Sequence, residues 1–494
     1  MNKSRYGKIQ EVFAIDYRSL AVFRIILAAM LLFDLAIRFP DISAHYTDEG
    51  VLPREALFKY FPQNATLCLH LLTGSWIGQV LIFFIHAVAA AMLFVGKKTR
   101  TCAFVCWLFL ISLQSRNELL LHGGDHYLRI LFFWAMFLPL NGCWAIDKSG
   151  RGQKQKTISS IATGCLIIQM AVVYWFSAAL KVGPEWTSNH SALYYALNIS
   201  YFKLPFGQYL LQFPSFLKLL TQGSLWLEWM GPFFFFLPMN FYQTRILVIA
   251  FFIFFHLGVA ATIYLGSLPY VFLIPLIVLV PSKLWDKLNQ NIEHALSYIG
   301  KFQSLKVNPK LNIWARSIGK TFAGFVIVAL GVYQLMENFE TTTKKHWIPA
   351  NLRWIASTLR IDQDWGMFAP FPYKIHGWFI VEGYGPSGEH IQILDREPAS
   401  SNENDRPSVP ALHRNGHWLS YSILTYTEHR EQLEQFGNYL CKKWNKEMRQ
   451  PPLSNVRISF MRMITPPEPD IMTPHKENLL AVNCEQSEEE FHVR

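Results

Sequence analysis

The sequence predicts an α-helical polytopic membrane protein, with eight or nine transmembrane helices and a C-terminal extracytoplasmic domain of α+β type that contains β-strands. Hydrophobic residues make up 51% of the 494 residues and charged residues only 16%, whereas an average soluble protein carries about 25% charged residues. Residues 1–336 carry a net charge of +14 and residues 337–494 a net charge of −4. Because the positive charge accompanies the apolar part of the chain, a membrane protein is expected, rather than a soluble enzyme or a partner of nucleic acid.

Nine apolar runs account for the predicted transmembrane helices. A helix needs about 20 mostly apolar residues to cross the hydrocarbon core of a bilayer. The runs that reach or approach this length lie at residues 19–38, 75–96, 101–121, 126–146, 159–181, 222–239, 245–265, 268–281 and 316–336. The eighth run is short and bounded by prolines, which is typical of a tilted or re-entrant segment. The polar first 18 residues argue against a cleavable signal peptide.

The charges in the connections predict the orientation of these helices. If the N-terminus is cytoplasmic, the connections on the cytoplasmic side hold 18 Lys and Arg residues and the opposite connections hold six. Cytoplasmic loops are enriched in Lys and Arg, so this orientation is favoured. With nine spans, the C-terminal domain then lies in the periplasm or an organelle lumen. The expected domains are a helical bundle at 1–284, a cytoplasmic linker at 285–315, a last transmembrane helix at 316–336 and an extracytoplasmic soluble domain at 337–494.

The C-terminal domain has the sequence pattern of a small mixed fold. Two β-type runs at 378–381 and 390–394 flank a Pro/Gly turn, which predicts a hairpin. The polar segment 396–410 predicts a surface loop. Residues 417–448 have the spacing of one amphipathic helix, and the last 25 residues predict a loose acidic tail.

Cysteine usage gives little information about the fold. Seven cysteines in 494 residues do not make a disulfide framework. Cys68, Cys441 and Cys484 are expected on the outer side, where oxidation is possible. At most one bridge can form among three cysteines; Cys441–Cys484 is the candidate pair, and the sequence alone does not decide whether it forms.

Four isolated polar residues lie inside the apolar runs. Ionisable groups in transmembrane segments are costly, and they mark ion pairs or functional pathways. Arg24 and Asp34 are ten residues apart, about 15 Å along a helix, so they cannot contact each other and need partners on other helices. Glu228 and His256 are similar cases. A structural polar network and a functional pathway are both open for these residues.

A cluster of polar residues stands at the entrance of the fourth run. It contains His122, Asp125, His126 and Arg129. Two histidines and one aspartate lack a third and fourth ligand of known position, so no metal ion is expected. One interpretation is helix capping by Asp125 beside surface histidines. The other is a proton relay or a site that orients a substrate.

Lys181 follows about 20 uncharged residues at the outer end of the fifth run. A lysine in this position can snorkel, with its amine among the lipid headgroups. Alternatively, an amine held in an apolar pocket loses its proton more readily and can act as a general base. The residues alone leave both interpretations open.

Several short motifs occur in an order that resembles a known family. They are Asp16–Ile25, Tyr46–Arg54, Gly124-Asp125 with Leu128-Arg129, Phe137–Leu140, and Trp365–Pro370 with Gly377–Phe379. Together they resemble the horizontally transferred transmembrane (HTTM) family over most of residues 13–395. This family includes the vitamin K-dependent γ-glutamyl carboxylases.

Two further stretches resemble the carboxylases themselves. Residues 173–181 are similar to the segment with the catalytic lysine of the carboxylases; Leu180 replaces the first of two adjacent lysines, and Lys181 falls on the second. The segment around His256 resembles the one with a membrane histidine near the quinone site. His122 and His126 flank the position of another catalytic histidine. Candidate cofactor-binding residues are Trp175 and Tyr270.

The resemblance implies an enzyme of the carboxylase (lyase) type. A lysine base would deprotonate a reduced quinone similar to vitamin K hydroquinone, with O₂ and CO₂ as co-substrates. A protein or peptide substrate would bind on the outer side, and its identity does not follow from the sequence. The alternative is a non-enzymatic HTTM membrane protein that binds lipid, quinone or a protein partner. A transporter ranks last, because no inverted repeat is evident.

Overall fold

The structure, a computed structural model, describes residues 11–147, 156–288, 317–393, 415–468, 470 and 472–484. The predicted linker at 285–315 and the predicted loop at 396–410 therefore lie almost entirely outside the described residues. The description below concerns the described ranges.

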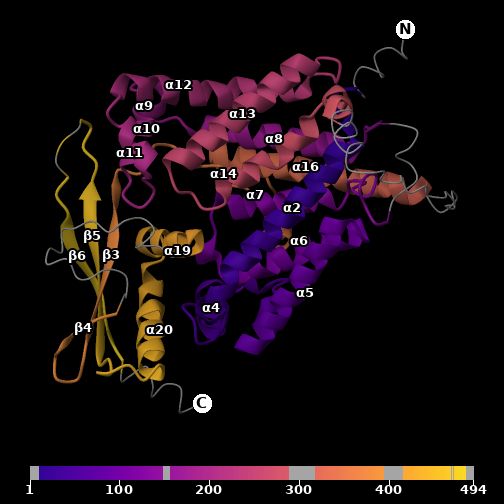
Figure 1. The fold of residues 1–494 in the computed structure, drawn as a ribbon. Coiled ribbons are helices and arrows are strands. Elements are labelled where there is room, and N and C mark those ends of the chain that lie inside the picture. The colour runs from indigo at the N-terminus through magenta and orange to yellow at the C-terminus, as the bar shows by residue number, and fades with distance from the viewer. Residues whose placement is uncertain are drawn as a thin grey trace, which may run out of the picture.

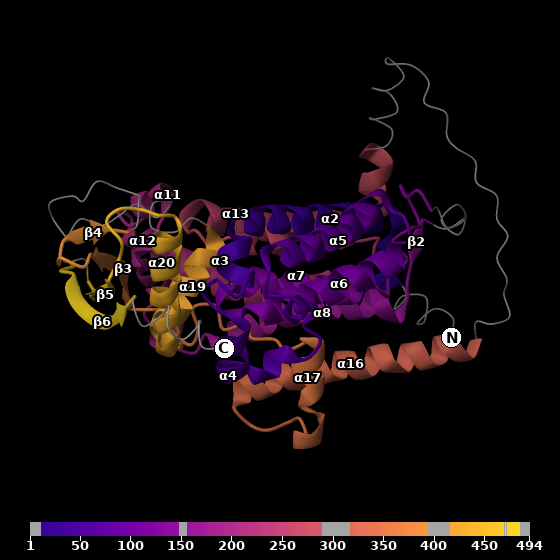
Figure 2. The same cartoon turned by 90° about the horizontal axis from the view of Figure 1, so that it is seen from below.

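A bundle of roughly aligned helices forms the larger part of the molecule (Figures 1 and 2). Each of the nine predicted apolar runs overlaps a helix of this bundle. The helices are α2 (Tyr17–Arg38), α5 (Trp76–Val95), α6 (Thr99–Arg116), α7 (Gly123–Ala135), α8 (Ile161–Leu180), α12 (Pro214–Met230), α13 (Tyr242–Thr262), α14 (Leu268–Leu273) and α16 (Ser317–Thr343). In Figure 2 the four strands between residues 375 and 483 lie at one end of this bundle, and β2 (Thr157–Ile158) lies at the other.

Fewer helices qualify as membrane spans than the sequence predicts. Four segments in the described residues are long and apolar enough: Tyr17–Tyr46, Trp76–Val95, Ile161–Leu180 and Tyr242–Thr262. A fifth is added if the pair Leu268–Leu279 and Ser282–Leu288, which is bent by 95°, counts as one span. The structure thus supports a membrane protein with four or five candidate spans.

For the runs at 126–146 and 222–239, the difference arises because the apolar run is longer than the helix it forms. The run at 126–146 gives only the 13-residue α7, after which the chain turns. The run at 222–239 leaves α12 at Met230 and continues as the 3₁₀ segment Gly231–Phe236, with Pro232 near its start. Proline has no backbone N–H to donate to an intrahelical hydrogen bond. In both runs the helix is shorter than the apolar stretch, so hydropathy alone overestimates the length of the helix.

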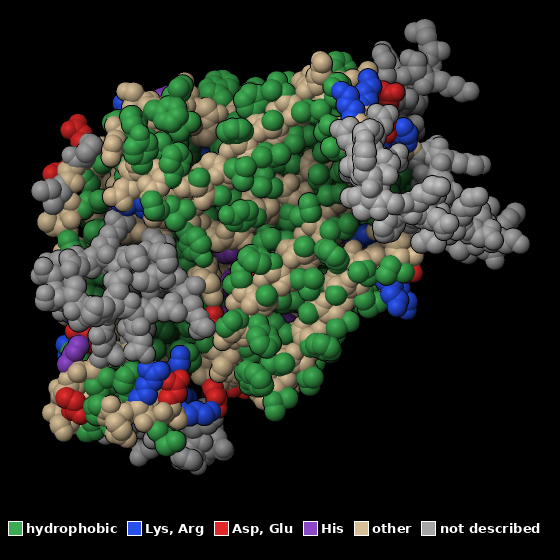
Figure 3. Space-filling model, viewed as in Figure 1, with side chains coloured by type: hydrophobic (Ala, Val, Ile, Leu, Met, Phe, Trp, Pro, Cys, Tyr) green, Lys and Arg blue, Asp and Glu red, His purple; other side chains and the backbone are tan. Residues whose placement is uncertain are grey.

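Some of the longer bundle helices have a side-chain cap at their start, and the bundle has an apolar outer surface. Ser160 and Thr163 form a capping box at the start of α8, and such a box satisfies backbone N–H groups that have no partner within the helix. Ser75 caps α5 in a similar way. Helices α5 and α13 expose large apolar side chains such as Phe84 and Phe254, and Figure 3 shows one face of the bundle covered by such side chains. An exposed apolar surface of this kind marks contact with a membrane or partner.

Short helices connect the long ones. They are α3 (Ile42–Tyr46), α4 (Arg54–Tyr60), α9 (Pro184–Thr187), α10 (Ala192–Asn198), α11 (Pro205–Leu210) and α17 (Trp354–Leu359). In Figure 1, α9, α10 and α11 lie at the end of the bundle that faces the sheet. A two-residue ladder of β1 (Ile15–Asp16) and β2 (Thr157–Ile158) joins the beginning of α2 to the beginning of α8.

The C-terminal domain is a four-stranded antiparallel sheet with two helices beside it. The strand order is β4-β3-β5-β6. The strands are β3 (Ile375–Tyr384), β4 (His390–Gln392), β5 (Asn455–Ile464) and β6 (His475–Asn483). Helices α19 (Gly416–Thr427) and α20 (Leu433–Lys446) lie between the sheet and the bundle in Figure 1; α20 packs on β5 and β6, and α19 packs on the bundle segment Glu118–Leu120.

The structure confirms one prediction for this domain and corrects two. Strands β3 and β4 pair as the predicted hairpin, with Gly383 opposite Ile391. The single amphipathic helix predicted at 417–448 is two helices, because α19 ends at Thr427 and a 3₁₀ turn precedes α20. The predicted loose tail is also partly wrong: β6 pairs with β5 along its length.

A disulfide joins Cys441 of α20 to Cys484, just after β6. It is the candidate pair of the sequence analysis, and Cys68 is buried without a disulfide. The bridge fastens the edge strand of the sheet to the helix that covers it.

We expect the double variant Cys441→Ser/Cys484→Ser to lose roughly 4 kcal/mol of unfolding free energy in the C-terminal domain, because the bridge closes a loop of 43 residues and so restricts the unfolded chain. Thermal unfolding with and without dithiothreitol measures this effect. The reductant should lower the melting temperature of the unmodified protein and leave that of the double variant unchanged. An unmodified protein insensitive to the reductant would contradict the assignment.

Candidate functional site

Lys181 stands at the end of α8, and its amine is buried. The residue is only 6% exposed. Its Nζ donates a hydrogen bond to Ser177 Oγ at 3.1 Å and forms an ion pair with Glu228 of α12. The Trp186 ring lies 4.9 Å from the amine, measured to the ring centroid. The amine therefore faces protein groups, and the structure does not place it among headgroups as a snorkelling lysine requires.

The loop after α8 is held in place by a distant segment of the chain. The Gly183 N–H donates to the Pro370 carbonyl at 2.9 Å, and Trp186 Nε1 donates to the Phe368 carbonyl at 2.9 Å. Phe368 and Pro370 belong to one of the motifs on which the family resemblance depends. This motif thus fixes the loop that covers Lys181.

The sequence identifies Glu228 as a polar residue in an apolar run but gives it no partner; in the structure its partner is Lys181. Glu228 is 5% exposed and lies 47 residues from Lys181 in the sequence. The signal in the sequence was a lone acid in an apolar run. An ammonium–carboxylate pair and an amine–carboxylic acid pair differ by the position of one proton.

A second polar pair joins α8, two turns before Lys181, to α13. The Tyr174 hydroxyl and His256 Nε2 are joined by a hydrogen bond of 2.7 Å. The seven residues from Tyr174 to Lys181 span about 10 Å along the helix. The other ring nitrogen of His256, Nδ1, is buried and has no hydrogen-bond partner among the described residues.

Three polar rings surround the Phe272 side chain of α14. The centroid of the Phe272 ring is 4.6 Å from that of Tyr127, 5.0 Å from that of His256 and 5.9 Å from that of Tyr174. The Tyr127 hydroxyl, like His256 Nδ1, is buried without a partner in the described part of the chain. Buried polar atoms are normally hydrogen-bonded, so these two atoms are available to a bound molecule.

The structure places the two candidate cofactor-binding residues differently. Trp175 Nε1 donates to the Trp229 carbonyl at 3.0 Å, next to Glu228, so Trp175 is close to the lysine site. Tyr270 is 51% exposed. On the short helix α14 the buried face belongs to Val271 and Phe272, so Tyr270 is not brought into the cluster around His256.

His122 and His126 are not joined to Lys181 by a hydrogen bond or an ion pair within the described residues. His122 instead belongs to a second cluster at the start of α7. Its backbone N–H donates to Asp125 Oδ2 at 2.9 Å, and its Nδ1 accepts from the Gly124 N–H at 3.0 Å. Asp125 therefore caps the helix. His126 follows it and is partly buried.

Arg38 is the centre of this second cluster. Its guanidinium donates to Asp34 Oδ2 at 2.8 Å, to Asp125 Oδ1, and to the Tyr46 hydroxyl at 2.7 Å. His417 of α19 reaches Asp34 Oδ1 with its Nε2 at 3.2 Å. All five residues are buried, so the cluster joins α2, α7 and α19 through polar groups that are shielded from solvent.

This cluster corrects the expectation that Asp34 needs all its partners from other helices. Arg38 lies one turn further along the same helix α2. Arg24 has no carboxylate partner within the described residues; its guanidinium donates to the carbonyl oxygens of Leu140 and Trp144. Arg129 donates to Gln114 Oε1 at 2.6 Å and lies 3.4 Å from an Asp362 oxygen.

Three groups of the second cluster have the character of metal ligands. Ligand atoms of His122, Asp125 and His417 lie within 4.8 Å of one another, and the two histidine rings stack with centroids 5.6 Å apart. However, Arg38 already supplies a positive charge to Asp125 and Asp34. We therefore assign no metal ion to this cluster.

An ion pair outside the bundle links the lysine loop to the sheet domain. Glu185 of α9 and Lys374, just before β3, are joined at 2.6 Å. Burial alone would raise the pKa of the Glu185 carboxyl, but the hydrogen bond from Lys374, a backbone hydrogen bond and the Lys374 charge together outweigh it, so the pKa stays below its usual range. The carboxylate is therefore charged near neutral pH.

A bundle with an apolar outer surface, buried ion pairs and a β-containing domain at one end defines a polytopic helical membrane protein. The model of the HTTM domain matches residues 13–285, which is more than half of the chain, and the chain belongs to the HTTM family. The match includes Lys181, Glu228 and His256, and it ends before α16 and the sheet domain. No curated protein and no solved structure matches the chain.

Proposed function

We propose that the protein is a membrane enzyme related to the vitamin K-dependent carboxylases, in which Lys181 and Glu228 together act as the base toward a reduced quinone. The observation that carries this proposal is the buried amine of Lys181 with its carboxylate partner on a neighbouring helix. In such a pair the carboxylate can accept the lysine proton, and the amine can then accept a proton from a substrate hydroxyl.

The residues around Phe272 fit the binding of a quinone ring. Tyr127 and His256 each offer a buried polar atom without a partner in the described residues, and aromatic rings surround them. A bound reduced quinone would supply the redox chemistry, because its oxidation by O₂ would give a strong base that removes a γ-proton from a glutamate side chain. CO₂ would then add to the carbon that has lost this proton. Tyr127 and His256 would hold the ring oxygens, and Trp186 would exclude water from Lys181.

The orientation of the protein is part of the proposal. We infer that the N-terminus is cytoplasmic, that the shorter helices also cross the bilayer to give eight or nine spans, and that the sheet domain lies on the periplasmic or lumenal side. The positive charges in alternate connections support this orientation. A peptide or protein substrate would then reach the lysine loop from the side of the sheet domain.

The test uses purified full-length protein in lipid nanodiscs, with reduced vitamin K, O₂, labelled bicarbonate and a glutamate-rich peptide. We expect the quinone epoxide to form and label to be fixed in the peptide. A matched control is Lys218→Met, because Lys218 lies exposed on α12, the helix that carries Glu228. This control should behave as the unmodified protein. Neither epoxide nor fixed label in any preparation would contradict the proposal.

A non-enzymatic role is the second candidate. The observation that favours it is that the Lys181 ammonium already has a hydroxyl, a carboxylate and an aromatic ring as partners, as a purely structural ion pair would. The protein would then bind a lipid, a quinone or a protein partner without turnover. Quinone binding without epoxide formation in the same assay would favour this role.

A further inference from the structure

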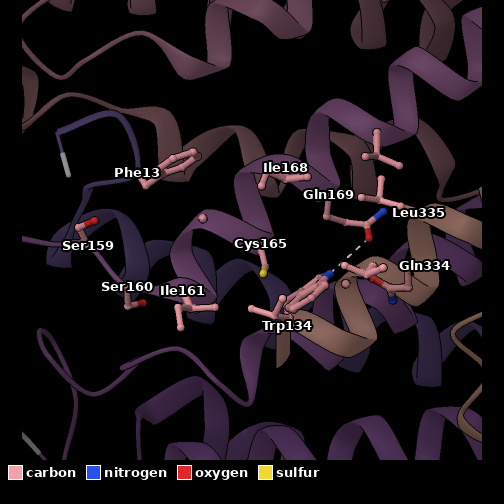
Figure 4. A pocket seen from close by; sticks show the side chains of 15 residues that line it. Phe13, Trp134, Ser159, Ser160, Ile161, Cys165, Ile168, Gln169, Gln334 and Leu335 are labelled. Carbon is pink, nitrogen blue, oxygen red and sulfur yellow. Dashed lines mark hydrogen bonds between the residues drawn. The ribbon is translucent and has the colours of Figure 1, made fainter. Parts of the chain in front are cut away.

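A cavity of about 420 Å³ lies between α8 and α16, where no proposed catalytic residue is found. Its lining is mostly apolar. In Figure 4, Gln169 and Gln334 lie toward one end of the cavity, and Phe13, Ser159 and Ser160 toward the other, with Cys165 and Trp134 between them. The cavity is therefore elongated, with its amide groups gathered at one end.

This cavity is separate from the lysine site. The lining residue of α8 closest in sequence to Lys181 is Val172, which is nine residues away, or about 14 Å along the helix. Neither Lys181, Glu228 nor His256 lines the cavity. A molecule bound there would not reach the lysine amine with its polar end.

The polar groups of the cavity define the chemistry of its ligand. Gln334 is 2% exposed, and neither its amide oxygen nor its amide nitrogen has a partner in the described part of the chain. Gln169, by contrast, is bonded to Gln363 at 2.9 Å and to Trp134 at 3.4 Å. A buried amide without partners is unfavourable, and a ligand with a carbonyl or hydroxyl group would satisfy it.

Among the described residues, the lining contains no charged side chain. A lipid with a charged phosphate or carboxylate would therefore lose its hydration without gaining a counter-charge. An apolar body fits the remaining surface, which is formed by residues such as Ile168, Val328 and Val332.

We propose that this cavity binds an uncharged membrane amphiphile, whose carbonyl or hydroxyl group pairs with the Gln334 amide and whose apolar chain lies between α8 and α16. Two sources have this chemistry: an isoprenoid quinone and a neutral acylglycerol. The proposal does not depend on catalysis at Lys181.

Cys165 provides a probe, because its side chain lines the cavity. The purified full-length protein is treated with N-ethylmaleimide in the presence of menaquinone, diacylglycerol or phosphatidic acid, and alkylation of Cys165 is measured by peptide mass spectrometry. We expect one or both neutral lipids to protect Cys165 and phosphatidic acid not to. The protecting lipid identifies the source. No protection by either neutral lipid, or equal protection by phosphatidic acid, overturns the proposal.

Two variants test the residues themselves. A Cβ at Gly331 would lie 3.7 Å from Trp134 and 3.8 Å from Cys165, so Gly331→Leu fills the cavity and should abolish protection. Gln334→Leu removes one hydrogen-bonding group and should raise the protecting concentration about three- to tenfold. The matched control is Gly258→Leu, since a Cβ at Gly258 meets no atom within 4 Å.

If a neutral lipid still protects Cys165 fully from alkylation in Gly331→Leu, the proposal is overturned. Lys181→Met should leave the protection of Cys165 unchanged, so a failure of the catalytic proposal is distinguishable from a failure of this one. Loss of Cys165 protection in Gly258→Leu would show that losing protection is not specific to filling the cavity, and would also overturn the proposal.

Discussion

Lys181→Met is expected to lower the turnover of reduced quinone by about 10²- to 10⁴-fold, which is the usual contribution of a general base. Methionine keeps much of the length of the side chain but cannot accept a proton. The change also leaves Glu228 buried without its partner, and breaking a buried pair costs about 3–5 kcal/mol. Epoxide formation and thermal unfolding must therefore be measured on the same preparations.

Two companion variants separate catalysis from stability. Lys181→Arg keeps a positive charge next to Glu228, but a guanidinium does not give up its proton; we expect it to remain folded and inactive. The double variant Lys181→Met/Glu228→Leu replaces both charges and should recover stability without activity. If either variant keeps the turnover of the unmodified protein, Lys181 is not the base.

Arg38→Met is expected to lower the free energy of unfolding by about 3–5 kcal/mol or more. The variant leaves Asp34 and Asp125 in the protein interior without the guanidinium that bonds to both. Only His417 would remain beside Asp34. The melting temperature of the purified protein, followed by intrinsic tryptophan fluorescence, measures the loss.

The control for Arg38 is Arg54→Met. Arg54 also forms an ion pair with an aspartate, Asp48, but the two side chains are 36% and 30% exposed, and an exposed pair contributes only about 0–1 kcal/mol. Neutralising the carboxylates in Asp34→Asn/Arg38→Met/Asp125→Asn should return part of the lost stability. Equal melting temperatures for Arg38→Met and Arg54→Met would contradict a central role of Arg38.

The sequence predicted the general architecture well because it depends on local patterns. Each apolar run overlaps a helix, and two short β-type runs around a Pro/Gly turn correctly predicted the pair β3 and β4. The number of spans could not be obtained in the same way. Hydropathy does not register where a helix ends inside an apolar run, as it does at Met230 before the 3₁₀ segment.

The partners of the site residues could not be predicted, because they depend on contacts between distant segments. Lys181 was recognisable as an unusual charge, but nothing in the sequence indicated that Glu228 would be its partner. The contact of His417 with the bundle was not predicted. His417 lies 383 residues from Asp34 in the sequence, at the start of a helix that was expected in the extracytoplasmic domain. The break between α19 and α20 was missed because it falls in the polar segment 428–432, which contains no glycine or proline to mark the end of a helix.

The position of His417 has a consequence for how the chain can be divided. The family match ends at residue 285, which suggests that the remainder could be removed as an appendage. Yet α19 places its imidazole beside Asp34, near the end of α2, so a fragment ending before residue 415 would open this buried polar cluster to solvent. The two regions are thus expected to melt as one cooperative unit, and protein for biophysical work should be expressed with both.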